Sequence, residues 1–492
     1  MISCVKWVPR GAASAKPLKY EVTVAEMEAF KRREGMQHSD IADQKELDRH
    51  GLPKSLRMDD YGEEYDNENF ENEGEDDADE AIAPSIMEAA LENGYSSGEE
   101  QEDEQDDEQD DVDMDESKEE DIVDDIEEED EEDQEDLDIK PTDKMVVVAQ
   151  TDEEFSVLEV YVYDEEEGSL YVHHDISLPA FPLSLAWLGC GANIFGDRVT
   201  TDSKNYMAVG TFKPEIEIWN LDVLDALEPS VVLGTDAGTA HTDAVMALSW
   251  NELQQHLLAS ASADKTIKVW DLSTRQCVKT FTHHTDKVQS VVWNPVEPTV
   301  LLSGSFDRTL VVFDAQGDQN IVRIQLESDV ECAIWNIHRP EQVLAATEDG
   351  YVTCFDVRNV AAGPLYRFQA HKKPCSSISI SRLAIGLLAT CSPDKSVRLW
   401  DLESGGIPKN VASKTMSAGA LFDCSFDMND PFMLAAGGDE GLLALWDVAD
   451  ESKIEQIFKN RTSLPVEPAV EVEEPKPDSA KKKKSKKKKS GK

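Results

Sequence analysis

A histidine, a serine or threonine, and an aspartate recur in the same order three times along this sequence of 492 residues. These are the residue types of a hydrolytic triad, in which the histidine takes the proton of a nucleophilic hydroxyl. An enzyme needs one triad, whereas these sets repeat at corresponding positions. The repetition favours a structural role for the three sets: His241, Ser260 and Asp264; His284, Ser303 and Asp307; and His371, Thr390 and Asp394.

No other pattern in the sequence indicates catalysis or metal binding. Walker-type GK[ST] and HExxH motifs are absent. The eight cysteines form no CxxC pair, which is typical of a chain from a reducing compartment. His173 and His174 are adjacent, as are His283 and His284, but neighbours on a strand point to opposite faces, so neither pair is expected to bind a metal. We therefore predict a protein that is not an enzyme and uses no cofactor or metal.

A repeat in residues 141–460 must position these side chains. Aromatic–Asp pairs, once aromatic–Asn, recur at intervals of 51, 43, 42, 45 and 46 residues, beginning with Trp219-Asn220 and ending with Trp446-Asp447. Runs such as VMALSWN, LLASASAD, TIKVWDL and CVKTF lie between turn residues and predict four strands in each unit. A period near 40–45 residues with these runs is typical of the blades of a β-propeller.

The number of blades follows from counting the strands. The third strand of the unit occurs seven times, counting LEVYVYD, but the first strand occurs only six times in residues 141–460. The N-terminal ISCVKWVP has the same pattern as VQSVVWNP at Val288–Pro295. We predict that residues 1–10 supply the missing first strand of blade one; the alternative is a strand-like N-terminus outside the ring. The expected fold is all-β, a seven-bladed WD40 β-propeller.

Trp-Asp-repeat blades often link a histidine before the first strand, a hydroxyl on the second, an aspartate in the next turn and the tryptophan of the third strand. Trp270 and Trp400 complete two of the three sets in this way, whereas Phe313 replaces the tryptophan of the other. Each aspartate is expected to orient its histidine, and the indole N–H to end the series, so that the buried polar groups are satisfied. Blades without the set are expected to be less rigid.

The charge is concentrated in one segment. Residues 59–138 hold 43 Asp or Glu and a single base, Lys118, and so account for most of the formal net charge of −55. Because carboxylates at this density repel one another, residues 36–138 are predicted to be a disordered acidic region, acting as a binding element for basic proteins or as a solvating spacer. The composition excludes a basic protein that coats nucleic acid, and no apolar run is long enough for a membrane-spanning helix.

The remaining segments carry localisation and modification signals. Residues 21–35 read as a short helix with Thr23 as its N-cap. Residues 461–492 are predicted to be a disordered Lys-rich tail whose cluster is a nuclear targeting element or a solvated tail; it contains Lys481, Lys482, Lys483, Lys484, Lys486, Lys487, Lys488 and Lys489. Ser96, Ser97 and Ser117 each have an acidic residue at position +3 and are candidate phosphorylation sites for an acidophilic kinase.

Several longer stretches carry a resemblance to a known family. They are ISCVKWV, the acidic insert, VYVYDEEEGSLYVHHDISLPAFPLSLAWL at Val160–Leu188, and IEIWNLDVLDALEP at Ile216–Pro229. Together they resemble the periodic tryptophan protein 1 family over nearly the whole predicted fold. The resemblance implies a nuclear, partly nucleolar, chromatin-associated factor linked to ribosome biogenesis through ribosomal RNA transcription and processing, and to histone-tail binding. The C-terminal lysine cluster and the dense acidic tract depart from the family pattern.

We therefore expect a non-enzymatic WD40 scaffold of the nucleus and nucleolus. Its expected partners are proteins, especially basic ones such as histones and ribosomal or nucleolar proteins, and the chain is expected to be a monomer within larger assemblies. Any direct contact with RNA would be non-specific, and no membrane is involved. The alternative is a substrate adaptor of a ubiquitin ligase or of another signalling complex.

Overall fold

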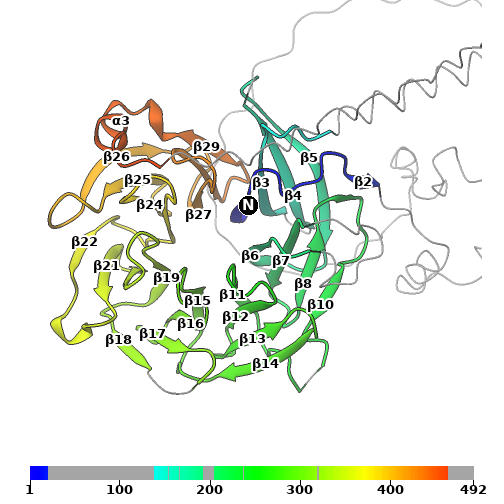
Figure 1. Ribbon diagram of the computed structural model, residues 1–492, viewed down its shortest axis with the longest axis horizontal. Coiled ribbons are helices and arrows are strands. Elements are labelled where there is room, and N and C mark those ends of the chain that lie inside the picture. The colour runs from blue at the N-terminus through cyan, green and yellow to red at the C-terminus, as the bar shows by residue number, and fades with distance from the viewer. Residues whose placement is uncertain are drawn as a thin grey trace, which may run out of the picture. The chain divides into compact units, whose positions relative to one another are not determined.

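The computed structural model describes residues 1–19, 138–152, 155–165, 167–191, 204–236, 238–317 and 321–463. These residues form a ring of seven antiparallel sheets, which confirms the predicted seven-bladed propeller (Figure 1). The helix expected at 21–35, the acidic region up to residue 137 and the lysine cluster all lie outside the described residues. Within the described ranges, no helix is both long and apolar enough to cross a membrane.

Blades 1 to 6 each contain four strands, counted from the central channel outward. The bounds of blades 1 and 2 are β1 (Ile2–Val8), β3 (Lys144–Asp152), β4 (Phe155–Asp164) and β5 (Ser169–Leu178), then β6 (Pro182–Leu188), β7 (Tyr206–Thr211), β8 (Ile216–Asn220) and β10 (Val231–Leu233). Blades 3 and 4 comprise β11 (Val245–Trp250), β12 (Leu257–Ser262), β13 (Ile267–Asp271) and β14 (Gln276–Phe281), then β15 (Val288–Trp293), β16 (Val300–Ser305), β17 (Thr309–Asp314) and β18 (Val322–Gln325).

Blades 5 and 6 comprise β19 (Val330–Trp335), β20 (Gln342–Thr347), β21 (Tyr351–Asp356) and β22 (Tyr366–Gln369), then β23 (Ser377–Ile380), β24 (Leu387–Cys391), β25 (Ser396–Asp401) and β26 (Lys409–Thr415). Blade 7 has three strands among the described residues, β27 (Leu421–Phe426), β28 (Met433–Gly438) and β29 (Ala444–Asp447). The short elements are β2 (Leu18–Lys19), β9 (Val223–Leu224), the 3-10 turns η4 (Val360–Ala362) and η5 (Val448–Asp450), and helix α3 (Ser452–Phe458).

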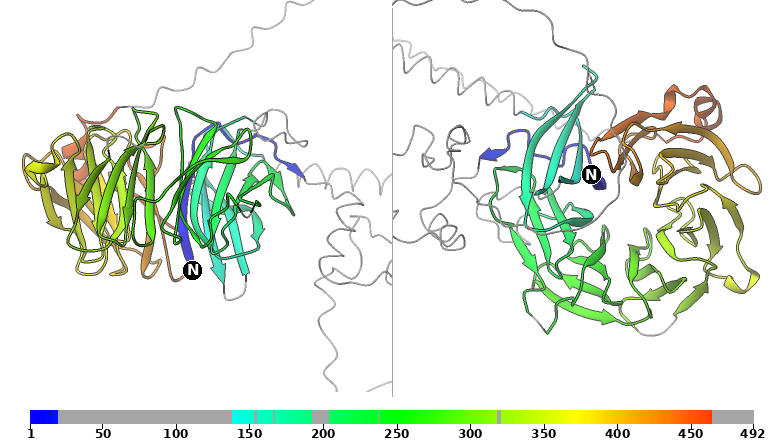
Figure 2. Two further views of the ribbon diagram at one scale, coloured as in Figure 1. Left: turned by 90° about the horizontal axis from the view of Figure 1, so that it is seen from below. Right: turned by 180° about the vertical axis from the view of Figure 1, so that it is seen from behind.

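The N-terminal strand β1 is the innermost strand of blade 1, beside β3 (Figures 1 and 2). Val5 lies opposite Val148, and Trp7 opposite Val146. The register of β1 shifts at its first residues, and the innermost strands of blades 2, 3, 4, 5 and 7 shift at the corresponding point. β1 therefore repeats the local geometry of the other innermost strands. The long insertion separates two adjacent strands of one sheet, and the free-energy cost of closing so long a loop is small because loop-closure entropy grows only slowly with length.

Apolar packing joins β1 to blade 7, the last blade in the chain. Ile2, Val5 and Trp7 are at most 2% exposed and form one cluster with Met433 and Ala435 of β28. Side chains along a strand point to its two faces in turn, so these residues of β1 and β28 face the same boundary between blades 1 and 7, which we call the seam. The seam closes the ring because it brings the first and last blades of the described chain into contact.

Two partly buried hydrogen bonds fix the register of this seam. Trp7 Nε1 donates to the carbonyl oxygen of Ser425 at 2.9 Å, and the backbone N–H of Val5 donates to Asp423 Oδ2 at 3.0 Å. The other oxygen of Asp423 accepts the hydroxyl hydrogen of Ser377 at 2.7 Å. Burial raises the pKa of Asp423. One carboxyl group of blade 7 thus contacts both neighbouring blades.

A second polar cluster lies at the end of the same seam. Lys144 of β3 is 2% exposed, and its Nζ lies 2.6 Å from Asp430 Oδ2 and 3.0 Å from Glu165 Oε1. The pKa of Lys144 lies above its ordinary value. Burial alone would lower it, but the hydrogen bonds to Asp430 and Glu165 have the larger effect. Nearby, Asp427 Oδ2 has no hydrogen-bond partner among the described residues, and burial raises the pKa of Asp427 to about 6.

The chain leaves and re-enters the described part on one face of the ring. Leu18 N donates to the carbonyl oxygen of Asp222 at 2.9 Å, β2 pairs in parallel with β9 of blade 2, and Ile139 N donates to Ala15 O at 3.0 Å. The face that carries Leu18, Ile139 and Ser463, where the innermost strands end, is called the exit face below. Both ends of the acidic insertion are therefore held at the exit face, beside blades 1 and 2.

Replacing the indole at the seam tests how much the closure contributes to stability. Trp7→Ala removes a fully buried side chain and its hydrogen bond, so we expect the free energy of unfolding to fall by about 3–5 kcal/mol. Urea denaturation measures the change. The control is Val278→Ala at a position on β14 that is 63% exposed and should change little. Equal stability of the Trp7→Ala protein and the wild type would contradict the closure role.

The buried carboxyl of Asp427 predicts a pH dependence. The pKa of Asp427 is about 6 in the folded protein, against an ordinary value of 3.8. The folded protein therefore binds this proton more tightly than the unfolded chain does. The resulting stabilisation is fully present below pH 3.8 and is lost as the pH rises through 6. Asp427→Asn keeps the amide oxygen as an acceptor and removes the charge. We expect it to be more stable than wild type by about 2–3 kcal/mol at pH 7.5, with most of that advantage gone at pH 4.5, as measured by urea unfolding. A difference that does not vary with pH would contradict this, and the exposed Asp450→Asn serves as control.

Candidate protein-interaction surface

The four residues predicted for blade 3 meet in one network. His241 precedes β11, Ser260 lies on β12, Asp264 follows β12 and Trp270 lies on β13. His241 Nε2 and Ser260 Oγ are 2.7 Å apart, and His241 Nδ1 and Asp264 Oδ2 are 2.9 Å apart. Trp270 Nε1 donates to Ser260 Oγ at 2.8 Å. The network ties the loop before the first strand to the second and third strands of the blade.

Blade 6 repeats this arrangement with a threonine. His371 lies 2.8 Å from Thr390 Oγ1 and 3.0 Å from Asp394 Oδ2, and Trp400 Nε1 donates to Thr390 Oγ1 at 3.1 Å. The four residues come from the loop before β23, from β24, from the turn after it, and from β25. The same connections therefore recur in a second blade.

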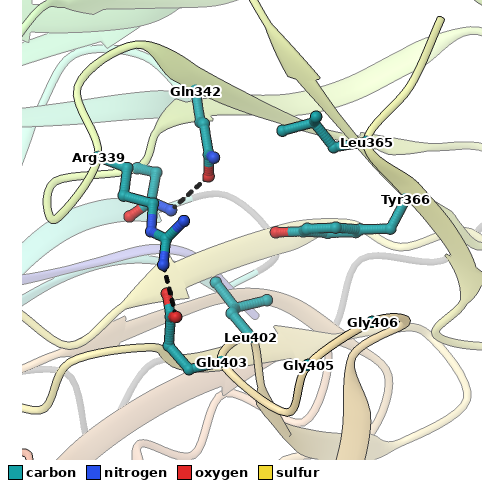
Figure 3. Close-up of a pocket in the computed structure, with 9 residues that line it drawn as sticks. Arg339, Gln342, Leu365, Tyr366, Leu402, Glu403, Gly405 and Gly406 are labelled. Atoms are coloured by element: carbon teal, nitrogen blue, oxygen red, sulfur yellow. Dashed lines mark hydrogen bonds and ion pairs between the residues drawn. The ribbon is translucent and has the colours of Figure 1, made fainter.

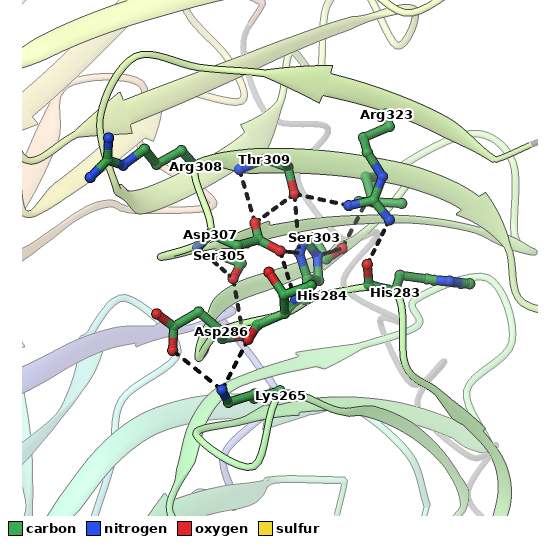
Figure 4. A network of polar contacts seen from close by, with 12 residues as sticks. Lys265, His283, His284, Asp286, Ser303, Ser305, Asp307, Arg308, Thr309 and Arg323 are labelled. Atoms are coloured by element: carbon green, nitrogen blue, oxygen red, sulfur yellow. Dashed lines mark hydrogen bonds and ion pairs between the residues drawn. The ribbon is translucent and has the colours of Figure 1, made fainter.

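Blade 4 contains the shortened version that the sequence predicts (Figure 4). His284 lies 2.8 Å from Ser303 Oγ and 3.0 Å from Asp307 Oδ2. Phe313 occupies the tryptophan position and has no side-chain N–H to donate. Ser303 Oγ lies 3.4 Å from the carbonyl oxygen of Val311, as Thr390 Oγ1 does from that of Arg398 in blade 6. This blade keeps the histidine and aspartate contacts without the indole.

Each network contains one further hydroxyl that is not among the residues predicted from the sequence. The hydroxyl group two residues after each aspartate donates to that aspartate's Oδ1 at 2.6 Å in all three blades; the residues are Thr266, Thr309 and Ser396. The signal was present as the segments DKT, DRT and DKS. A side chain two residues beyond an aspartate is well placed to close such a turn, so spacing alone could have identified these hydroxyls.

The geometry resembles a triad, but its hydroxyls cannot reach a substrate. Ser260, Ser303 and Thr390 are 0% exposed. Two of these oxygens already accept an indole hydrogen. A nucleophile must contact the reacting carbonyl, so the three sets of His, Asp and Ser or Thr are structural in the described propeller.

The charges in the networks are fixed by burial and hydrogen bonding. Burial lowers the pKa of His284 and of His371, which favours neutral imidazoles at neutral pH. For Asp264, burial raises the pKa, but hydrogen bonds from His241 and Thr266 outweigh it and hold the pKa well below its usual range. The carboxylate therefore stays ionised while it accepts hydrogen bonds from its neighbours.

These networks hold cationic residues in unusual backbone conformations at the surface. The residue after each network aspartate has a positive φ of 64° to 73°, and these residues are Lys265, Arg308 and Lys395. The left-handed region is costly for a residue with a Cβ and persists where surrounding bonds determine it. We call the face that carries these three residues the network face; it is opposite to the exit face because it holds the starts of the innermost strands.

The three cations each reach toward the next blade. Lys265 Nζ donates to Thr285 O at 2.9 Å, Arg308 Nε lies 3.0 Å from Asp329 Oδ1, and Lys395 Nζ lies 3.6 Å from Glu440 Oε1. The lysine and arginine side chains are 53% to 59% exposed, so each contact adds little to stability. Their effect is to hold charges at set positions on the network face, where a protein partner could contact them.

A polar pocket opens on the exit face between blades 5 and 6 (Figure 3). Its volume is about 320 Å³, and an ion pair of 2.6 Å between Arg339 and Glu403 lies across it. Burial raises the pKa of Tyr366, whose ring lines one side. Gly405 and Gly406 line another side without side chains. No sequence pattern predicts this pocket, because loops of two different blades build it.

One expectation about the histidine pairs is wrong. His173 and His174 were expected to point to opposite faces of their strand, but their Nδ1 atoms lie 2.8 Å apart. The pairing of β4 with β5 shifts register there, Val160 lying opposite His174 and Tyr161 opposite Val172, and this bulge brings both rings together. Burial lowers the pKa of His174 to about 3. The described residues contain no group of three or more His, Cys, Asp or Glu able to hold a metal ion.

The other sequence-predicted residues cannot be placed. Ser96, Ser97 and Ser117, and the lysine cluster beginning at Lys481, lie outside the described ranges. The structure thus brings together the three blade networks and leaves the targeting and phosphorylation predictions as predictions.

Removing a shared hydroxyl tests the network of blade 6. Thr390→Val keeps the shape of the side chain but leaves Trp400 Nε1 and one nitrogen of His371 without their partner. We expect a loss of about 1–3 kcal/mol in the free energy of unfolding, measured by urea denaturation. The matched control is Thr415→Val, at an exposed position of β26, which should lie close to wild type. Equal effects of the two substitutions would contradict a stabilising network.

Comparison with known proteins agrees with this geometry. Residues 234–271, 275–314 and 362–401 match the family model of the WD domain, G-beta repeat. A WD repeat-containing protein of Schizosaccharomyces pombe, itself uncharacterized, is 46% identical over 347 residues, which cover 67% of this chain and 66% of that protein.

Two further relatives carry a family name. Periodic tryptophan protein 1 of Saccharomyces cerevisiae is 28% identical over 66% of each chain. The periodic tryptophan protein 1 homolog of Drosophila melanogaster is 30% identical over 62% of this chain and 67% of that protein. The chain thus spans about two thirds of the length of the relatives it matches. The repeated blade motifs, the seven-bladed ring and these matches all indicate the same family. The chain belongs to the periodic tryptophan protein 1 family of WD-repeat proteins.

Proposed function

We propose that this protein is a non-enzymatic scaffold that assembles proteins during ribosome biogenesis, in the nucleus and nucleolus. The observation that supports the proposal most directly is the propeller of a periodic tryptophan protein 1 family member, whose repeated polar networks are buried and whose loops are held in fixed positions. A rigid ring presents many loop surfaces at once, which suits the assembly of several partners. Its functions in ribosomal RNA transcription and processing would follow from the partners it holds.

The two faces suit different parts of this task. The network face presents fixed charges from the turns after the second strands, and the exit face holds both ends of the acidic insertion. A polyanion fixed at both ends to one face attracts basic segments to that face, over a range that salt shortens. The proposed partners are accordingly basic proteins: histones, through which the protein would associate with chromatin, and ribosomal or nucleolar proteins.

Modification and targeting would adjust the same interactions. Phosphate on Ser96, Ser97 or Ser117 would add about −1.5 to −2 charges each to the acidic insertion and strengthen its attraction for basic segments. The lysine cluster at residues 481–489 would direct the protein to the nucleus and nucleolus, where these partners are concentrated.

Proximity labelling with the full-length protein tests the proposal. The matched variant replaces residues 59–137 with a neutral Gly/Ser segment of the same length and leaves the propeller unchanged. We expect ribosomal proteins, histones and components of the ribosomal RNA transcription machinery to be labelled by the wild type, and the basic ones to be labelled several-fold less by the variant. Recovery of ubiquitin-ligase subunits in their place would contradict the scaffold proposal and favour the substrate-adaptor alternative.

A salt series on the purified protein separates the two roles of the acidic insertion. Binding of histone and ribosomal-protein peptides should weaken steeply between low and moderate salt in the wild type and be weak in the neutral variant at every salt concentration. Equal binding by both proteins would mean that the insertion is a spacer and that the propeller faces alone hold the partners.

A further inference from the structure

Blade 7 is incomplete among the described residues. Its sheet contains β27, β28 and β29, whereas each of the other six sheets of the ring has a fourth, outermost strand. After Asp447 the chain turns into η5 and α3, and no described strand pairs with the outer side of β29. An open sheet edge presents unpaired N–H and C=O groups to a strand of suitable sequence.

Two leucines of blade 7 are more exposed than their counterparts. Leu445 lies opposite Ala435, as Val269 lies opposite Ala259 in blade 3. In blades 3 to 6 the residues that correspond to Leu445 are at most 6% exposed; they are Val269, Val312, Cys354 and Leu399. The residues that correspond to Leu443, two positions earlier, are 0% exposed; they are Ile267, Leu310, Val352 and Val397. Leu445 and Leu443 are only half-buried, and the adjacent Leu442 is 55% exposed. A fourth strand would cover them.

The two sides of the open edge differ in character. On one side, Leu443 and Leu445 pack against the buried cluster that contains Trp7 and Met433, as Tyr161 and Tyr163 of blade 1 also do. On the other side, Lys414 of blade 6 places its Nζ 5.2 Å from the ring centre of Trp446. A matching strand would therefore be apolar on the side toward blade 1 and acidic on the side toward blade 6.

We propose that Val466–Glu473 of the same chain adds to β29 as the fourth strand of blade 7. Its sequence, VEPAVEVE, alternates strictly, with Val466, Pro468, Val470 and Val472 on one side and mainly glutamates on the other. The valines would face Leu443 and Leu445, and Glu471 would face Lys414. Proline is accepted in an outermost strand, where its missing N–H faces away from the sheet.

The path of the chain allows this addition. Ser463, the last described residue, bonds to Leu383 on the exit face, where β29 ends and where an antiparallel fourth strand would begin. Leu464 and Pro465 link Ser463 to Val466 and, when extended, allow an advance of up to about 10 Å. The strand-like segment that follows Lys19 is a weaker candidate, because Lys19 is paired with Leu224 of blade 2, on the far side of blade 1.

Hydrogen exchange of the full-length protein tests the proposal. We compare the wild type with Val470→Asp/Val472→Asp and with the control Ser479→Asp/Ala480→Asp, which adds the same charge beyond the proposed strand. Amides of Leu442–Asp447 should exchange about tenfold faster in the valine variant than in the wild type or the control, because the added hydrogen bonds are lost. Equal exchange in all three proteins would overturn the proposal.

Photo-crosslinking identifies the occupant of the edge even if the valine variant is poorly folded. With Leu442→p-benzoylphenylalanine in the full-length wild-type background, we expect an intramolecular crosslink to a peptide within residues 464–475. Leu253→p-benzoylphenylalanine, 53% exposed in a complete blade, is the control and should give no such product. A crosslink from position 442 to a second copy or to another protein would assign the edge to that partner and overturn the proposal.

Discussion

The propeller depends on the insertion of β1 between β3 and blade 7. On one side β1 completes the sheet of blade 1, with Val5 opposite Val148, and on the other it covers Met433 and Ala435. Asp423 adds a half-buried carboxyl that accepts hydrogen bonds from blade 1 and from blade 6 at once. Without β1, blade 1 would have an open inner edge and blade 7 an open apolar face, so the ring closes only when β1 packs against blade 7.

This way of closing the ring also determines how the acidic insertion is held. The insertion interrupts one sheet between β1 and β3, and its two ends are bonded at the exit face through Asp222 and Ala15. The described residues on either side of the insertion are therefore fixed at one face of the ring.

Much of this architecture could be predicted from the sequence because it repeats. Period-two runs at intervals of 42 to 51 residues identified six third strands, LEVYVYD added the seventh, and the likeness of ISCVKWVP to VQSVVWNP identified the N-terminal strand. Three features could not be read in this way. The meeting of His173 with His174 depends on a register shift against β4, the pocket beside Arg339 depends on two neighbouring blades, and the missing outer strand of blade 7 appears only when the exposure of Leu443 is compared with that of Ile267.

The use of the N-terminal strand has a consequence at the other end of the chain. In a ring of four-stranded blades, a terminal segment can complete either an inner or an outer strand where the ends meet. Here β1 completes the inner position of blade 1, so it cannot also supply the outer position of blade 7. The chain that follows β29 first packs α3 against blade 6, with Ile454 and Phe458 fully buried, and reaches Ser463 still on the exit face. The position beside β29 is therefore left to residues outside the described ranges or to another chain, and the alternation of valine and glutamate that begins at Val466 favours the segment after Ser463.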